Sequence, residues 1–480
     1  MPIYAFGSNG SGQLGIGHKE DVSVPTRCLF RDDIARAAAG TSIKSTTTST
    51  TTASIAAQQQ QQQQQRRLGI NDEEEEEDIP VKVAAGGNHT LVLFRSGAVF
   101  AAGALGDALF DEFDREDKEG EKDEKYDPED ILRRVSFKDP ISGQRIDRFK
   151  HVFATWDASF FIAFSDDKDI IYAYGIGSKG ELGLGTPIMK AAQPTRIPDF
   201  PPVGLNVVAV DACMGHAALV LSDGSAFGWG ASRKGQLGEG NVDAKVIWSP
   251  ARITPEKGKE RATGVVCGRE FTVLCMEETQ NKPDEKQGQL RFAFFGPEKE
   301  KDKWGTSSLK HVDPSSLPNI GSPARIAASW HNVYIHNADN SIVAWGRNDR
   351  GQIPPGCSYT DTKPTTITTT NNDNNSDDNR PSDTAIDRVE SLAVGSEHVL
   401  ALTSDGNVLA AGWGEHGNCG PNTDEDGDVK GRWARIEFGR DLSAGEGQRE
   451  EEGEKKEVVI GLGGGCATSW ILTRRGRDGL

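Results

Sequence analysis

One segment of the sequence recurs along the chain with a constant internal spacing. Its clearest copy, VDACMGHAALVLSDGSAFGWGASRKGQLGEG, holds a short apolar run, a turn carrying His216, an alternating run, an Asp-Gly turn and a third run. His216 precedes Gly230 by 14 residues, and His398 and His89 stand at the same interval before later glycines. Short alternating runs separated by glycine-rich turns indicate a meander of antiparallel strands.

The copies add up to seven when the two ends of the chain are joined. Six units are complete, among them weaker copies in ATWDASFFIAFSDDKDIIYAYG, VCGREFTVLCMEE and ASWHNVYIHNADNSIVAWG. The chain opens with a second half, IYAFGSNGSGQLGIG from Ile3, and closes with a first half, VVIGLGGGCATSWILT from Val458. An open solenoid would need polar capping units, whereas a closed ring leaves no sheet edge exposed. The sequence therefore predicts an all-β fold, a seven-bladed β-propeller closed by pairing of the N- and C-terminal strands, in a single domain over residues 1–480.

Four polar stretches interrupt the repeats. They include a threonine-rich segment, a tract of eight glutamines and several acidic runs, none of which can bury a core. We expect them to be disordered insertions in loops of the propeller. Their approximate ranges are 41–78, 111–129, 361–385 and 421–457.

Charge and composition limit the classes of function. Against 54 lysines and arginines stand 72 aspartates and glutamates, a formal net charge of −18, which disfavours direct nucleic-acid binding. No apolar run reaches the roughly 18 residues of a membrane helix, and the N-terminus lacks a signal-peptide pattern. The seven cysteines form no C-x-x-C pair, which is typical of reduced thiols. The expectation is a cytoplasmic protein, with the nucleus as a further location, that does not bind membranes.

The sequence contains no recognisable catalytic or cofactor motif. Nucleophile-elbow, zinc-protease and phosphate-loop patterns are all missing, and GLGGGC at Gly461–Cys466 precedes a strand-like run instead of a helix. We therefore expect no enzyme activity, no cofactor and no bound metal. The equivalent residues His89, His216 and His398 could ring one end of the axis as metal ligands, but turn-bracing hydrogen bonds are the favoured interpretation.

The equivalent turns differ from blade to blade, and these differences mark candidate binding residues. By the repeat, all the turns lie on one face around the axis. Aromatic and arginine side chains on loops of a rigid scaffold are common anchors of protein interfaces. The alternative is that the tryptophans fill the central channel. The candidates are Trp156 with Asp157, Arg269 with Glu270, Trp330 with His331, and a second patch of Trp413 with His416.

The pattern G-x-x-H, DG, WG and GQLG within residues 207–240 resembles the regulator-of-chromosome-condensation repeat family. The opening YAFGSNGSGQLGIGHKEDVSVPT is similar to the fungal alpha-tubulin suppressor proteins, also known as killer-toxin-insensitivity propellers. This resemblance implies a non-enzymatic adaptor, monomeric or in a heterodimer, that pairs with a small metalloprotein of diphthamide synthesis. It also implies support of Elongator-dependent modification of tRNA wobble uridines and a link to tubulin-related proteins. The metal would then belong to the partner.

A second function follows from the family's namesake, which is a guanine-nucleotide exchange factor for a small Ran-like nuclear GTPase. That protein resembles a chromatin-bound factor with a basic N-terminal tail. Here the repeat pattern begins at Ile3 and the chain is acidic, so docking on nucleosomes is not expected. A ubiquitin-ligase targeting propeller would need a catalytic domain for which the chain is too short.

Overall fold

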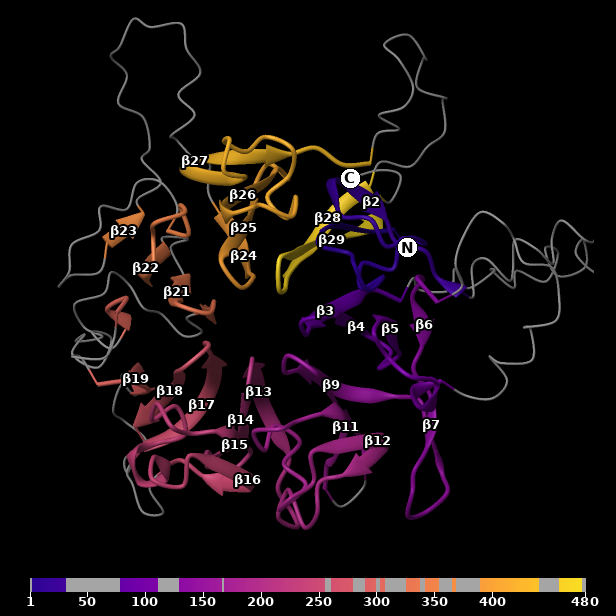
Figure 1. Ribbon diagram of the computed structural model, residues 1–480, viewed down its shortest axis with the longest axis vertical. Helices are drawn as coiled ribbons and strands as arrows, with labels where there is room; N and C mark the ends of the chain where they lie inside the picture. The colour runs from indigo at the N-terminus through magenta and orange to yellow at the C-terminus, as the bar shows by residue number, and fades with distance from the viewer. Residues whose placement is uncertain are drawn as a thin grey trace, which may run out of the picture.

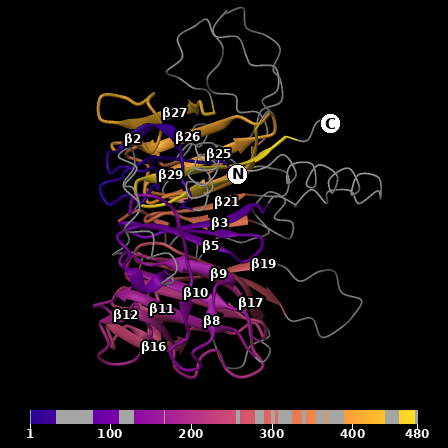
Figure 2. The same cartoon turned by 90° about the vertical axis from the view of Figure 1, so that its right-hand side faces the viewer.

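The strands form a ring of sheets around a central axis (Figure 1). The computed structural model describes residues 2–31, 78–110, 129–165, 168–254, 260–278, 290–298, 303–306, 325–336, 342–353, 365–367, 389–439 and 457–476. Within these ranges, seven sheets make up the ring, and each is an antiparallel meander. The predicted all-β, seven-bladed propeller is therefore confirmed. From the side, the strands of neighbouring blades run from one face of the ring to the other (Figure 2).

The blades are numbered here in chain order, and the first strand of each lies nearest the axis (Figure 1). Blade 4 has three described strands and the others have four. Among the described residues, a two-stranded hairpin and two single-turn 3-10 helices lie outside the blades. The elements are, for blade 1, β3 (Pro80–Ala85), β4 (His89–Phe94), β5 (Val99–Gly103) and β6 (Arg133–Arg134); for blade 2, β9 (Phe149–Ala154), β10 (Ala158–Ala163), β11 (Ile170–Ile176) and β12 (Lys190–Arg196); for blade 3, β13 (Val207–Cys213), β14 (His216–Leu221), β15 (Ala226–Ala231) and β16 (Val246–Arg252); for blade 4, β17 (Glu260–Cys267), β18 (Thr272–Glu278) and β19 (Leu290–Phe295); for blade 5, β20 (Arg325–Ala328), β21 (Asn332–His336), β22 (Ile342–Gly346) and β23 (Thr365–Ile367); for blade 6, β24 (Val389–Val394), β25 (His398–Thr403), β26 (Val408–Trp413) and β27 (Asp428–Ile436); for blade 7, β28 (Glu457–Gly464), β29 (Thr468–Arg475), β1 (Ile3–Gly7) and β2 (Val22–Arg27); and, outside the blades, β7 (Phe137–Lys138), β8 (Arg145–Ile146), η1 (Asp107–Leu109) and η4 (Glu239–Asn241).

The two ends of the chain close the ring by sharing blade 7. Strand β1 pairs with β29 in register from Ile3 opposite Leu472 to Gly7 opposite Thr468. The hydroxyl of Thr473 also donates to the carbonyl oxygen of Pro2, at 2.8 Å. The half-repeat at the N-terminus thus completes the half-repeat at the C-terminus, as the sequence predicts.

The 14-residue interval between histidine and glycine is a cross-strand pair. His216 lies directly opposite Gly230 on the neighbouring strand, and the other two histidines have the same register. Gly230 has a φ of +103°, and a Cβ at this position would collide with the carbonyl oxygen of Gly215. Only glycine fits both the backbone angle and the close approach. The third strand of a blade therefore needs a glycine near its end, at the position opposite the histidine.

The hydrophobic core lies mainly between adjacent blades. The interface of blades 2 and 3, for example, contains Phe153, Phe160, Leu219 and Trp229, all at most 2% exposed. The indole Nε1 of Trp229 donates to the carbonyl oxygen of Glu181 at 2.6 Å, so the ring is buried without an unpaired donor. Within the described residues, each blade packs its apolar side chains against two neighbours.

Two of the predicted insertions contain blade strands, which corrects the expected boundaries. Strand β23 lies within 361–385 and β27 within 421–457, and each is the outermost strand of its blade. Strand β27 was missed because acidic residues precede it and because Gly431 and Arg432 interrupt its alternation of apolar and polar residues. Of 41–78 and 111–129 only Asp78 and Glu129 fall within the described residues, so the expectation for these stretches lies outside them.

None of the helices in the described ranges has the length and apolarity that crossing a bilayer requires.

Candidate protein-binding face

The turns between the first and second strands of the blades gather at one end of the central channel. We call this end of the ring the mouth face. Backbone N–H groups there donate from blade to blade: Gly87 to Trp156, Trp156 to Met214, Arg269 to Trp330, Trp330 to Ser396, and Ser396 to Gly465, at 2.9–3.0 Å. The predicted convergence of these turns is what the structure shows. The hydrogen bonds make the mouth a rigid platform, which is a favourable setting for binding loops.

Beneath the mouth the channel contains a cavity of about 150 Å³, lined by residues of all seven blades. Its wall carries the thiols of Cys213, Cys267 and Cys466 and a pair of opposite charges, Lys82 and Asp211. Burial raises the pKa of Asp211, and the charge of Lys82 partly offsets this effect. Burial also raises the pKa of the Cys466 thiol, to about 11, so this group is protonated at neutral pH. The cavity wall is therefore unsuited to thiolate chemistry.

Trp156 and Trp330 meet at the channel mouth although they come from blades 2 and 5. Their ring centroids are 5.9 Å apart, and the guanidinium of Arg269 lies 5.4 Å from the centroid of the Trp330 ring. Both tryptophans line the cavity and are half-buried, so each closes the channel below and presents part of its ring outward. The two interpretations of these tryptophans, channel filling and surface anchor, thus describe opposite sides of the same rings. We call this group the Trp-Arg cluster.

The other residues predicted beside this cluster occupy its rim. Asp157 is exposed, and Glu270 is paired with Lys234 at 3.5 Å. His331 is half-buried, and its Nδ1 lies 2.6 Å from a carboxylate oxygen of Glu397.

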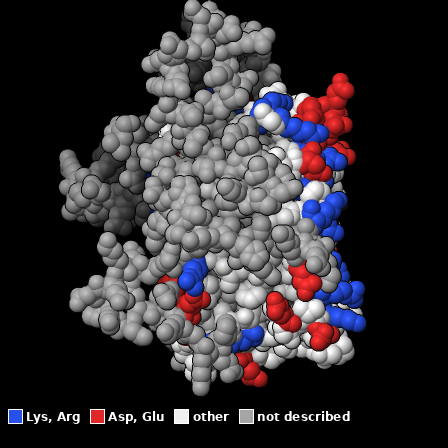
Figure 3. Space-filling model, turned by 90° about the vertical axis from the view of Figure 1, so that its left-hand side faces the viewer, with Lys and Arg blue, Asp and Glu red and all other residues white. Residues whose placement is uncertain are grey.

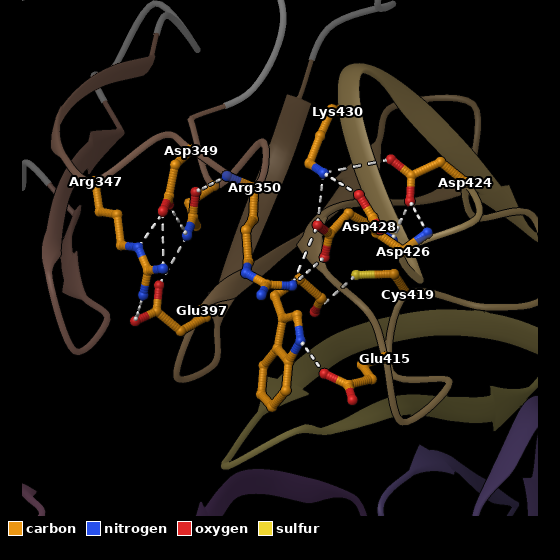
Figure 4. Close-up of polar contacts among 12 residues, drawn as sticks. Arg347, Asp349, Arg350, Glu397, Glu415, Cys419, Asp424, Asp426, Asp428 and Lys430 are labelled. Carbon is orange, nitrogen blue, oxygen red and sulfur yellow. Dashed lines mark hydrogen bonds and ion pairs between the residues drawn. The ribbon is translucent and has the colours of Figure 1, made fainter.

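A buried carboxylate holds the rim of blade 5 against blade 6. Glu397 is only 4% exposed and accepts hydrogen bonds from Arg347 at 3.1 Å and from Gln352 at 2.9 Å, besides its contact with His331. Burial raises the pKa of Glu397, but hydrogen bonds and charges from His331, Gln352 and Arg347 outweigh it and leave the pKa below its ordinary value. Figure 4 shows Arg347 between Asp349 and Glu397. The Arg347 guanidinium also lies 4.9 Å from the centroid of the Trp304 ring.

Trp413 and His416 form a separate patch at the junction of blades 6 and 7. Their rings meet edge to face with centroids 5.4 Å apart, and Trp413 Nε1 donates to Glu415 at 3.1 Å. His416 Nδ1 lies 2.9 Å from a carboxylate oxygen of Asp21, in the loop between β1 and β2. The two predicted patches therefore share the mouth face, and among the described residues no direct contact joins them.

An acidic cluster borders this second patch. Asp424, Asp426 and Asp428 turn their carboxylates toward one another, and Lys430 Nζ lies 3.6, 3.3 and 2.8 Å from them, respectively (Figure 4). Arg350 approaches Asp428 at 3.4 Å from blade 5. The lysine amine thus stands where a cation would bind, and it offsets part of the negative charge.

Two of the three equivalent histidines connect successive blades. His216 Nε2 lies 2.9 Å from the Thr272 hydroxyl of blade 4, and His398 Nε2 lies 2.9 Å from the Ser469 hydroxyl of blade 7. The favoured interpretation of turn-bracing hydrogen bonds is confirmed for these two. Burial lowers the pKa of His89, His216 and His398 to about 4, so all three rings are neutral at pH 7.

Several residues of this face were not predicted. Trp304 follows the charged run PEKEKDK and falls outside the repeat pattern, so spacing could not place it beside His331. Glu397 occupies the variable position of a turn, next to His398, and was passed over. The one available signal was that GSEHV, unlike the other histidine turns, carries a carboxylate before its histidine.

Known proteins share both the repeat and the fold. The model described as "Regulator of chromosome condensation (RCC1) repeat" matches residues 3–43 and 223–275, and a second model of the same description matches 389–418. The RCC1 repeat-containing protein C10F6.04 of Schizosaccharomyces pombe is 26% identical over 349 residues, which are 70% of this chain and 79% of that protein. The secretion-regulating guanine nucleotide exchange factor of Mus musculus is 25% identical over 88% of this chain and 76% of its own length. The solved structure of Prp20p from Saccharomyces cerevisiae superposes with a TM-score of 0.58 at 16% identity, covering 99% of this chain and 92% of that one, which shows the fold alone. The repeat matches and the seven-bladed ring closed at blade 7 identify the chain as a propeller that carries regulator-of-chromosome-condensation repeats.

Proposed function

We propose that the chain is a non-enzymatic, protein-binding propeller, and that its mouth face is the binding surface. The observation that carries this proposal is the Trp-Arg cluster, in which half-buried tryptophans and an exposed arginine are fixed on turns joined by backbone hydrogen bonds. Aromatic and arginine side chains held rigidly lose little conformational entropy on binding, which is why they dominate interface energetics. The proposal covers a monomer or heterodimer in the cytoplasm, with the nucleus as a further location.

The partner we propose is a small metalloprotein of diphthamide synthesis, bound by an adaptor that also supports Elongator-dependent wobble-uridine modification. This part rests on the similarity of the opening segment to the fungal alpha-tubulin suppressor propellers. The same similarity extends the proposal to tubulin-related proteins. In this arrangement the partner supplies the metal, and the propeller supplies surface and orientation.

The test is direct binding between the purified chain and that recombinant metalloprotein, measured by calorimetry. Replacement of Trp156 or Trp330 by Ala should weaken binding by about 2 kcal/mol or more, roughly thirtyfold in Kd. Trp413→Ala tests the second patch in the same way. Phe164→Ala is the matched control, because Phe164 is 63% exposed and follows the end of β10 that lies away from the mouth face. Melting temperatures exclude loss of fold, and Trp330→Phe should retain much of the affinity.

Guanine-nucleotide exchange is the second candidate function. It is favoured by the 25% identity over 88% of this chain to the mouse protein that is named a secretion-regulating exchange factor. Accelerated release of labelled GDP from a purified Ran-like GTPase, at catalytic amounts of the chain, would establish exchange and displace the adaptor proposal. Absence of binding to the metalloprotein at micromolar concentrations would reject the proposed partner.

A further inference from the structure

The mouth face carries a group of basic residues that runs against the acidic charge of the chain as a whole. We call it the cationic arc; it lies on the turns and loops of blades 2 to 5 at the mouth. In Figure 3, Lys and Arg side chains follow the right-hand margin, which is the side that faces the reader in Figure 1, and Asp and Glu side chains gather above them. The arc consists of Lys179, Arg233, Lys234, Arg269, Arg347 and Arg350.

Half of the arc is uncompensated by ion pairs. Lys234 is paired with Glu270, Arg347 with Glu397 and Asp349, and Arg350 with Asp428. Within the described ranges, Lys179, Arg233 and Arg269 form no ion pair, and all three are exposed. In a chain of net charge −18, exposed cations without an ion-pair partner at the mouth offset part of the negative charge there.

Part of the cationic arc adjoins the Trp-Arg cluster. Arg269 contacts the Trp330 ring, and Trp330 contacts Trp156. Lys234 lies on the rim through its pair with Glu270, the residue after Arg269, and Arg233 precedes Lys234 in the same loop. Apolar rings flanked by free guanidinium groups suit a ligand that presents carboxylates and apolar side chains together.

From these observations we infer that the partner docks an acidic protein segment, with aromatic or aliphatic side chains among its carboxylates, on the cationic arc and the Trp-Arg cluster. This inference rests on the proposed function, because it names the chemistry of the partner at the same face. Complementary charge would steer encounter and exclude basic partners, while the tryptophans supply the buried contact.

A single-stranded nucleic acid is the competing ligand, because it too combines negative charge with rings that stack on tryptophan. The carboxylates interspersed in the arc argue against it. Glu270 lies on the turn of Arg269, Asp349 lies in the loop of Arg347 and Arg350, and the acidic cluster of blade 6 adjoins Arg350. A phosphate backbone carries charge at every step and would meet these groups, whereas a peptide can place its carboxylates between them.

The test uses a labelled peptide of about twelve residues, built from Glu-Glu-Phe-Glu repeats, in fluorescence anisotropy at about 0.01 M salt, where the Debye length is about 30 Å. Its counterpart with Gln for Glu and an oligouridine of similar length are the comparison ligands. The triple variant R233E/K234E/R269E should raise the Kd of the acidic peptide by about tenfold or more. The control R95E/R252E/R435E makes the same change in net charge at exposed positions away from the mouth, and it should leave the Kd within about twofold.

Four results would overturn the inference: no binding of the acidic peptide, equal binding of its Gln counterpart, equal weakening by both triple variants, or tighter binding of oligouridine that the mouth variant abolishes. The proposed function fails separately. If Trp330→Ala releases the metalloprotein while R233E/K234E/R269E does not, the mouth face binds protein but not through an acidic segment. If the metalloprotein binds the chain and neither Trp330→Ala nor R233E/K234E/R269E weakens that binding, the mouth face is not the binding surface.

Discussion

The histidines of the repeat show how one side chain joins two blades. In His216 and His398 the ring crosses to a hydroxyl at the start of the next blade's second strand. His89 faces the corresponding Ser159 position, yet His89 Nε2 and Ser159 Oγ have no hydrogen-bond partner among the described atoms. Where the repeat replaces histidine, Asn332 turns to its own blade, donating to Arg347 and accepting from Ser329. Histidine is therefore used where the following blade offers a hydroxyl.

Burial of these histidines predicts a specific dependence of stability on pH. Their pKa falls from the ordinary 6.5 to about 4, so the folded protein resists protonation that the unfolded chain accepts. Above pH 6.5 the three rings are neutral in both the folded and the unfolded chain, and the free energy of unfolding is at its full value. As pH falls from 6.5 toward 4, each histidine should lower the free energy of unfolding by about 1.4 kcal/mol per pH unit. Urea unfolding between pH 6.5 and 5 measures the slope, and His398→Gln should reduce it. An identical slope in the variant would contradict this account.

At the scale of elements, the repeat predicted inner strands better than outer ones. The first three strands of a blade carry the fixed spacing, because the histidine-glycine pair and the glycine turn demand it. The fourth strand pairs along one edge only, tolerates polar residues and starts after loops of variable length, so β23 and β27 were assigned to insertions. The candidate tryptophans were found because they break a strict pattern, while Trp304 lies where no pattern exists.

Strand β23 provides a test at this scale. It pairs with β22 from Ile342 opposite Ile367 to Ala344 opposite Thr365. Excision of 361–385 removes this strand and should lower the melting temperature, because the edge of β22 loses its partner. Excision of 368–385 spares β23 and should melt close to the intact chain, as the polar composition of that stretch predicts. Equal melting of the two deletions would show that β23 contributes nothing to blade 5.

For the molecule as a whole, closure turns seven weak units into one cooperative structure. Blades contact their neighbours through apolar interfaces, and blade 7 is built from both ends of the chain. Its packing reaches both neighbours, since Tyr4 and Phe6 pack in the cluster with blade 6, and Ile3 and Trp470 in the cluster with blade 1. The mouth face depends on ring closure, because its series of blade-to-blade hydrogen bonds includes the one from Ser396 of blade 6 to Gly465 of blade 7.

Removal of residues 1–17 should therefore destabilise every blade, although it deletes a single inner strand. It takes away β1, exposes the edge of β29 and uncovers the apolar side chains of two neighbouring blades. We expect aggregation or a sharp fall in melting temperature, measured by circular dichroism and light scattering.

A synthetic peptide of residues 1–31, which holds both β1 and β2, should restore folding to a chain that starts at residue 78, whereas a scrambled peptide should not. The register from Ile3 to Gly7 makes this rescue specific, and Ala5→Pro in the peptide should abolish it because proline cannot donate in the pairing with its neighbours. A truncated chain that melts like the intact protein would show instead that six blades hold the ring without the seventh.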